Sequence, residues 1–141
     1  MNYRITTTDD LQHLAEWNHQ LILDEGHRNP MDIPQLKERM REWTTTGGRT
    51  AVVIEENGVA VAYALYREGA TEIYLRQLFV MRHLRRQGIG RRAVEILISQ
   101  LWPKKKRLTV GVLTQNQSAV AFWRAMGYRD YSLALEIMPR S

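Results

Sequence analysis

Two glycines set among arginines are the residues of this sequence best suited to chemistry. The segment 80–92 reads VMRHLRRQGIGRR, with glycines at 88 and 90, and it separates an apolar strand-like run from a segment of helical spacing. The first turn of a helix has unpaired N–H groups and a positive dipole end, and glycines let the backbone approach an anion closely. The segment therefore predicts a site for a phosphate-bearing ligand, the alternative being a glycine-rich turn with solvated arginines.

A dinucleotide site is a rival interpretation, because Gly88-x-Gly90-x-x-Ala93 matches that fingerprint formally. The fingerprint requires a strand that ends at the first glycine and an acidic residue about 20 positions later. Here residues 82–87 intervene, and residues 106–112 (KRLTVGV) contain no acid. The spacing disfavours a dinucleotide fold.

Composition limits the remaining classes. The 141 residues, 44% hydrophobic and 25% charged, suit one globular domain over residues 1–141. Cysteine is absent, which excludes disulfides, thiolate metal sites and a cysteine nucleophile, and four histidines alone predict no metal site. No run approaches the roughly 18 apolar residues of a membrane span, and the N-terminus lacks a signal-peptide core. We expect a cytoplasmic domain without a membrane partner.

The net charge of +5 favours an anionic partner. The basic residues cluster in segment 82–92 and in the run 104–107, which can equally be a solvated surface. Neither cluster contains the interleaved aromatic residues that single-stranded nucleic acids stack on, so we expect no nucleic-acid partner.

The elements that must position the glycine turn follow from periodicity and turn signals. Apolar residues at helical spacing predict four helices, and β-branched runs predict six strands, two of them joined by an Asn57-Gly58 hairpin turn. The order β-α-α-β-β-β-α-β-α-β predicts an α/β fold with a mixed, largely antiparallel central sheet. The expected strands cover 3–6, 50–55, 59–66, 73–81, 108–113 and 129–138, and the expected helices 11–23, 32–46, 90–102 and 118–126.

Two motifs together resemble a known family. Arg85-x-x-Gly88-x-Gly90 is similar to the coenzyme A signature of the GNAT superfamily of N-acetyltransferases. The later segment 116–128, NQSAVAFWRAMGY, resembles that superfamily's second motif, an Asn and an Ala followed by an aromatic pair and Gly-Tyr. The order of elements is also similar over the whole chain.

The resemblance implies acetyl-coenzyme A as co-substrate, bound where the sheet splays beside the strand that precedes the glycine turn. It implies that the pantetheine arm pairs with the backbone of Leu78, Phe79 and Val80, and that Arg85 or the run 104–107 reaches the 3′-phosphate. Backbone amides would hold the pyrophosphate, and side chains of the second motif would line the arm. The residues implied are Arg86, Gln87, Gly88, Ile89, Gly90 and Arg91 for the pyrophosphate, and Asn116, Ala119, Phe122 and Trp123 for the arm. From position alone, Asn116 is a helix N-cap, and the aromatic pair can be core.

Acetyl transfer to a primary amine needs a base, an oxyanion donor and an acid for the departing thiolate. Without cysteine, direct attack in a ternary complex is the expected route. Many relatives carry a tyrosine acid where this chain has Trp123, and indole is a very poor proton donor, so Tyr128, Tyr131 or water remain for that role. Glu72 is one candidate base.

The segment 24–29 (DEGHRN) belongs to the region that shapes the acceptor pocket in the superfamily. Asp24, Glu25 and His27 are therefore candidate acceptor-binding residues that would suit a cationic small-molecule or peptide amine, and Glu25 is a second candidate base. A surface loop is the alternative. Two wider alternatives also stay open: a noncatalytic coenzyme A sensor, and a homodimer paired through the last strand.

Overall fold

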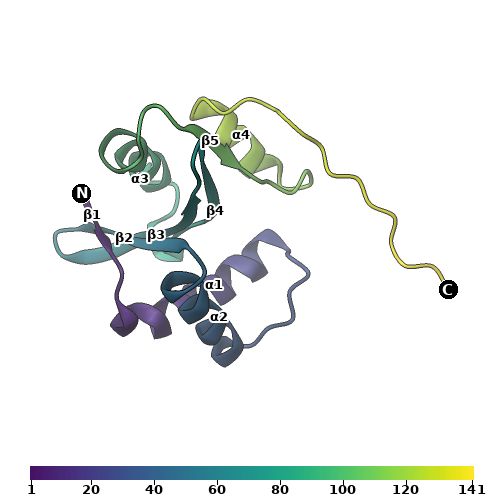
Figure 1. Ribbon diagram of the computed structural model, residues 1–141, viewed down its shortest axis with the longest axis horizontal. Helices are drawn as coiled ribbons and strands as arrows, with labels where there is room; N and C mark the ends of the chain where they lie inside the picture. The colour runs from purple at the N-terminus through teal and green to yellow at the C-terminus, as the bar shows by residue number, and fades with distance from the viewer.

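β-Branched and apolar runs form a five-stranded sheet in the computed structural model, which describes residues 1–141 (Figure 1). The strands are β1 (Asn2–Ile5), β2 (Arg49–Glu56), β3 (Val59–Glu68), β4 (Glu72–Val80) and β5 (Arg107–Val110), in spatial order β1-β2-β3-β4-β5. The first three pairings are antiparallel and β4–β5 is parallel. Asn57 and Gly58, with φ of 54° and 77°, form the predicted hairpin turn. The prediction of a mixed, largely antiparallel sheet is confirmed.

Helices cover both faces of the sheet (Figure 1). α1 (Leu11–Glu25) and α2 (Ile33–Thr45) lie on one face, and α3 (Ile89–Ile96), continued by a π-helical segment η3 (Leu97–Leu101), lies on the other. α4 (Gln117–Ala125) follows β5. A capping box begins α2, since the Asp32 carboxylate accepts from the Gln35 amide at 2.9 Å. No helix combines the length and apolar character needed to cross a bilayer.

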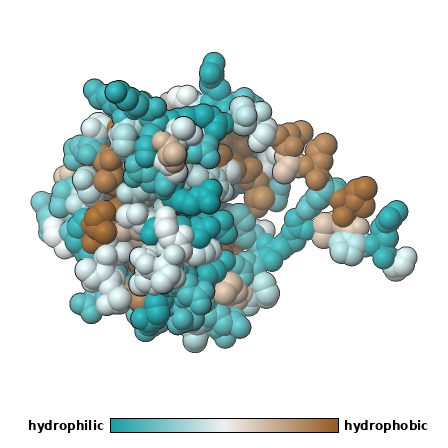
Figure 2. Space-filling model, in the orientation of Figure 1, coloured by the Kyte–Doolittle hydropathy of each residue, from teal (hydrophilic) through white to brown (hydrophobic).

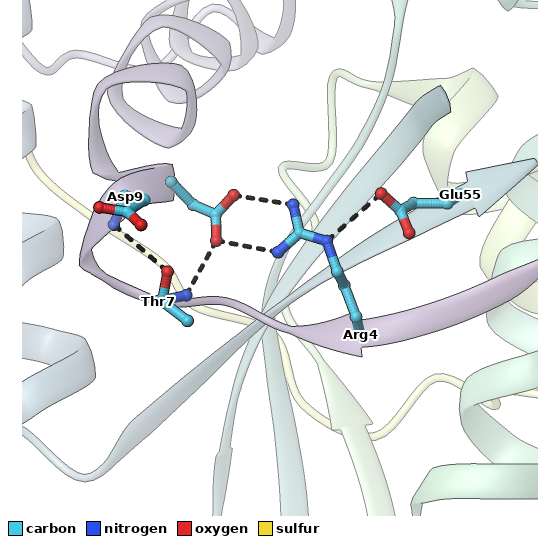
Figure 3. A network of polar contacts seen from close by, with 5 residues as sticks. Arg4, Thr7, Asp9 and Glu55 are labelled. Atoms are coloured by element: carbon cyan, nitrogen blue, oxygen red, sulfur yellow. Dashed lines mark hydrogen bonds and ion pairs between the residues drawn. The ribbon is translucent and has the colours of Figure 1, made fainter. Parts of the chain in front are cut away.

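The first strand is fixed by one arginine (Figure 3). Arg4 makes a bidentate contact with Asp10 at 2.8 and 3.0 Å and reaches Glu55 of β2 at 3.3 Å. Asp10 also accepts from the backbone N–H of Thr7, which caps the short 3-10 turn η1 (Thr8–Asp10). The contacts tie β1 to β2 and to the turn η1, which leads directly into α1 at Leu11.

The sheet divides two hydrophobic cores, and β4 contributes to both. Ile73 and Leu75 belong to the core under α3, where Leu78 and Val80 also pack. Phe79 belongs to the core under α1 and α2. A bulge opposite Leu65 and Tyr66 shifts the alternation midway along β4. Leu78 and Val80 thereby stay on the same face as Ile73 and Leu75, and Phe79 faces the other core.

The prediction of a sixth strand over 129–138 is wrong for this chain in isolation. The segment alternates apolar and polar residues as a strand does, but no backbone pairing is formed, because no second strand lies beside it. Its apolar side chains point into solvent and stand out on the extended C-terminal segment (Figure 2). Their exposed fractions are 83% for Tyr131, 65% for Leu133, 84% for Leu135 and 85% for Ile137.

Candidate coenzyme site

The sheet opens between β4 and β5. Their parallel pairing runs from Glu72↔Arg107 to Leu75↔Val110 and then stops, while β4 continues to Val80 with β3 on its other side only. Residues 76–80 therefore present an edge without a partner strand toward the gap, where the Val80 carbonyl accepts only from the Arg85 side chain. An extended chain can add to such an edge through main-chain hydrogen bonds. The splay that the sequence predicts is confirmed, and it places Leu78, Phe79 and Val80 at the opening.

The glycine turn follows this edge directly and presents a row of free amides. From residue 86 to residue 91 no backbone N–H donates to another part of the chain, and pairing resumes where the Arg92 amide donates to the Gly88 carbonyl at 3.1 Å. Gly88 caps α3 with φ of 77°, and Arg86 has φ of 65°. Consecutive amides in such a turn, at the positive end of a helix dipole, form an anion-binding concavity. The turn fits a pyrophosphate.

The arginines around the turn make different contacts. Arg85 is folded inward: its Nε donates to the Val80 carbonyl at 3.0 Å, and its guanidinium lies 2.8 Å from Asp24. Arg82 also contacts Asp24 at 2.8 Å. Partial burial alone would raise the pKa of Asp24, but hydrogen bonds from Arg82 and Arg85 outweigh it and hold that pKa below its ordinary value. Asp24 thus ties α1 to the turn and is not a free negative charge for an acceptor.

Other basic side chains differ in their access to the turn. Arg91 is paired with Glu95 at 3.1 Å, whereas Arg86 is exposed and has no acidic partner. The run 104–107 begins beyond η3, and α3 with η3 spans residues 89–101, roughly 20 Å. Within that run, Lys106 is paired with Glu68 and Arg107 with Glu72. The location does not favour the run as a ligand of the 3′-phosphate.

α4 brings the second motif against the first. A Cβ on Gly90 would lie 3.5 Å from the Phe122 ring, so the aromatic side chain covers the start of α3. Asn116 caps α4, its Oδ1 accepting from the Ala119 amide at 3.3 Å, while its side-chain nitrogen donates to no protein group. Trp123 is 9% exposed and packs edge-on against Phe122 and Tyr128. Trp123 is a core residue, and Phe122 and Ala119 are half-buried.

Tyr128 carries a buried hydroxyl without a hydrogen-bond partner. Burial raises the pKa of Tyr128 to about 12. A phenol with that pKa keeps its proton at neutral pH but gives it up less readily than an ordinary tyrosine. The structure thus weakens the case for Tyr128 as the acid.

The two candidate bases lie in different places. Glu72 begins β4 and pairs with Arg107 at 2.8 Å, six positions or roughly 20 Å from Leu78. Glu25 ends α1 and contacts His27 at 3.1 Å. Burial, opposed by the Arg39 charge and reinforced by the Glu25 carboxylate, raises the pKa of Tyr63. Glu25 thus ends the helix that covers the sheet face where Phe79 packs beside Tyr63.

A buried polar pair on this face was not foreseen from the sequence. The Tyr63 hydroxyl donates to Gln77 Oε1 at 2.8 Å, and both side chains are almost fully buried. Gln77 is adjacent to Leu78 at the open edge. One glutamine inside an apolar strand carries no distinctive pattern, so only the pairing across β3 and β4 reveals it.

Comparison with known proteins gives the family. No curated protein sequence matches the chain. A mutant of the BH1408 protein from Bacillus halodurans is similar in structure, with TM-score 0.79 and 23% identity over 99% of this chain and 100% of that one. The aminoglycoside N-acetyltransferase AAC(6′)-Iy, in complex with CoA, has TM-score 0.76 and 13% identity over 99% and 95%. A predicted acetyltransferase from Clostridium acetobutylicum, with acetyl-CoA, has TM-score 0.71 and 15% identity over 97% and 95%.

Because the sequence identities are low, these structural likenesses establish the fold and nothing more. The model of the Acetyltransferase (GNAT) family matches residues 11–128, which include both β4 with the glycine turn and α4 with its aromatic pair. The chain belongs to the GNAT acetyltransferase family.

Proposed function

We propose that this protein transfers the acetyl group of acetyl-coenzyme A to a primary amine by direct attack in a ternary complex. The observation that carries the proposal is the junction of the open edge at 76–80 with the unpaired amides at 86–91. The open edge suits an extended, amide-bearing arm, and the adjoining turn suits a pyrophosphate. Two structural neighbours are described as complexes with CoA or acetyl-CoA, which supports this choice of ligand.

The residues have separate parts in this proposal. Amides of Arg86, Gln87, Gly88, Ile89, Gly90 and Arg91 hold the pyrophosphate. The backbone at Leu78, Phe79 and Val80 pairs with the arm and supplies an N–H for the developing oxyanion. Asn116, through its free side-chain nitrogen, and Phe122, which covers Gly90, flank the arm. When bound, the coenzyme supplies the thioester, whose carbonyl carbon accepts the amine.

Glu25, with His27, is the base in this proposal. The pair lies at the end of α1, which covers the sheet face that carries Phe79 of the open-edged strand β4, whereas Glu72 lies at the far end of β4. A carboxylate hydrogen-bonded to a histidine can remove a proton from an ammonium group near neutral pH. Water supplies the proton to the departing thiolate, because Trp123 is a poor donor and the Tyr128 pKa is raised.

Two measurements test the function. Calorimetry should show acetyl-coenzyme A binding to the purified protein, and free thiol should appear when small-molecule and peptide amines are added. Absence of acetyl-coenzyme A binding in the wild-type protein would rule the proposal out.

A noncatalytic coenzyme A sensor is the second candidate, and Trp123 is the observation that favours it. The indole is core, packed between two aromatic rings, so this position offers no acid. Tight coenzyme binding without thiol release across a broad amine panel would identify the sensor. Thiol release that depends on an amine would exclude it.

A homodimer formed through the C-terminal segment is a further proposal. The segment 128–134 and β5 line a cavity of about 1200 Å³, and the outer edge of β5 has no partner strand. The exposed Leu133, Leu135 and Ile137 alternate as strand residues do. We propose that this segment pairs with the sheet of a second copy. Light scattering should give a dimer mass, and Leu133→Asp with Leu135→Asp should give a monomer; a monomeric wild-type protein would contradict the proposal.

A further inference from the structure

Three arginines surround one tryptophan on the sheet face covered by α1 and α2. The guanidinium carbons of Arg39, Arg49 and Arg76 lie 4.1, 4.9 and 4.7 Å from the centre of the Trp43 ring. They come from α2, β2 and β4, so the tertiary fold brings them together. Stacking on an indole ring orients a guanidinium and leaves its N–H groups free at the edge.

No carboxylate balances this arginine cluster. Ten other Lys and Arg side chains form ion pairs with Asp or Glu, but Arg39, Arg49 and Arg76 form none. Burial, together with the charges of Arg76 and Arg49, lowers the pKa of Arg39. Like charges repel and are retained at close range only at a free-energy cost. An anion bound among the three guanidinium groups would relieve this repulsion.

Two buried donors beside the cluster also lack partners. Arg39 donates to Asn18 Oδ1 at 3.2 Å, and the amide nitrogen of Asn18 has no acceptor of its own. Asn18 is 1% exposed, and the Nε of Arg39 is likewise buried and unpaired. Buried donors are nearly always satisfied in folded proteins. Both donors lie beside the Arg39 guanidinium, where an oxyanion would supply acceptors.

The cluster is close to the site of transfer but on the opposite side of the sheet from α3. Arg76 precedes Leu78 by two positions, about 7 Å along β4, and adjoins Gln77, which is bonded to Tyr63. The charges of Arg39 and Glu25 both act on the Tyr63 hydroxyl. The glycine turn begins α3, so the coenzyme phosphates are bound elsewhere. An acceptor lying along this face can meet Glu25 with its amine and the arginines with another group.

We propose that Arg39, Arg49 and Arg76, held around Trp43, bind an oxyanion of the acceptor, so that the acceptor is a primary amine that also carries a carboxylate or phosphate. The inference rests on the proposed transferase function and narrows the acceptor from any primary amine to one that also carries an anionic group. The acidic pocket expected from Asp24 is neutralised by Arg82 and Arg85, whereas the arginine cluster is open to an anion.

The kinetic test compares acceptors that differ only in charge. Wild-type protein is assayed with an ω-amino carboxylate series, the matching aminoalkyl phosphates and the neutral methyl amides. We expect kcat/KM to favour the anionic acceptors, and Arg49→Gln and Arg76→Gln each to reduce that preference by about 10- to 100-fold. Arg41→Gln is the matched control, because Arg41 lies on α2 with Arg39 and Trp43, carries the same charge and pairs only with Glu38. Comparison of the phosphate series with the carboxylate series identifies which oxyanion is preferred.

A second readout needs no turnover. Inorganic phosphate, compared with chloride at equal ionic strength, should stabilise wild-type and Arg41→Gln protein against heat more than the Arg49→Gln/Arg76→Gln double variant. Turnover without a preference for anionic acceptors, or a preference that survives in the double variant, would overturn this inference and leave the proposed transferase function standing. Phosphate stabilisation lost in the double variant, combined with no thiol release from any amine, would retain the oxyanion site and reject the transferase function.

Discussion

Replacing Gly88 by alanine tests the glycine turn with a built-in control. Gly88 has φ of 77°, and a Cβ added there would meet no atom within 4 Å, so the cost of the substitution is backbone strain alone. An L-residue in the left-handed region costs about 1–2 kcal/mol. For a chain of this length, that corresponds to a fall of about 3–10 °C in Tm.

The effect on coenzyme binding should be larger. Relief of the strain rotates the peptide units that flank residue 88 and turns the neighbouring amides away from the anion. Each hydrogen bond to a charged group is worth about 1.5–3 kcal/mol, so losing two weakens acetyl-coenzyme A binding by more than about 100-fold. Calorimetry with acetyl-coenzyme A measures the loss directly.

Gly58 provides the control. It has the same φ of 77°, a Cβ there also meets nothing within 4 Å, and it lies in the hairpin turn between β2 and β3. Gly58→Ala and Gly88→Ala should lose similar stability, but only Gly88→Ala should lose coenzyme affinity. Equal affinities in the two variants would refute the role of the turn amides.

Two further predictions concern the chemistry. Glu25→Gln should lower kcat by about 10²- to 10⁴-fold with coenzyme affinity retained, whereas Glu72→Gln should change kcat little; steady-state kinetics showing the reverse order would return the base to Glu72. Tyr128→Phe should keep kcat within about threefold, because the phenol is a weak acid, and should be at least as stable as wild type at pH 7, because an unpaired buried hydroxyl is removed. The folded-state pKa of Tyr128, about 12, exceeds the ordinary value of 10.0. Wild-type protein should therefore lose stability as the pH rises from 10 to 12, and Tyr128→Phe should lose less over the same range. Identical alkaline unfolding curves for the two proteins would contradict this prediction.

The sequence predicted those features that are set by local chemistry. The Asn57-Gly58 turn and the helix that follows the glycine turn each depend on residues next to one another, and both appear in the structure. The two GNAT motifs also follow from short spacings. Their contact, Phe122 against Gly90, required the fold.

Features set by distant residues escaped prediction. The arginine cluster joins three separate elements around Trp43, and the Tyr63–Gln77 bond crosses two strands. The strand predicted over 129–138 is wrong for a related reason. Alternating apolar and polar residues indicate that a strand can form, but a strand needs a neighbour to pair with, and a single copy of the chain provides none. Asp24 looked like a free charge in the sequence and is an ion-paired residue in the structure.

The most direct test is the measurement of free thiol released from acetyl-coenzyme A by the wild-type protein, with and without amines. We predict that thiol appears only when an amine is present, and that one acetylated amine forms for each thiol released. Binding of acetyl-coenzyme A with no amine-dependent thiol release would contradict acetyl transfer at this site.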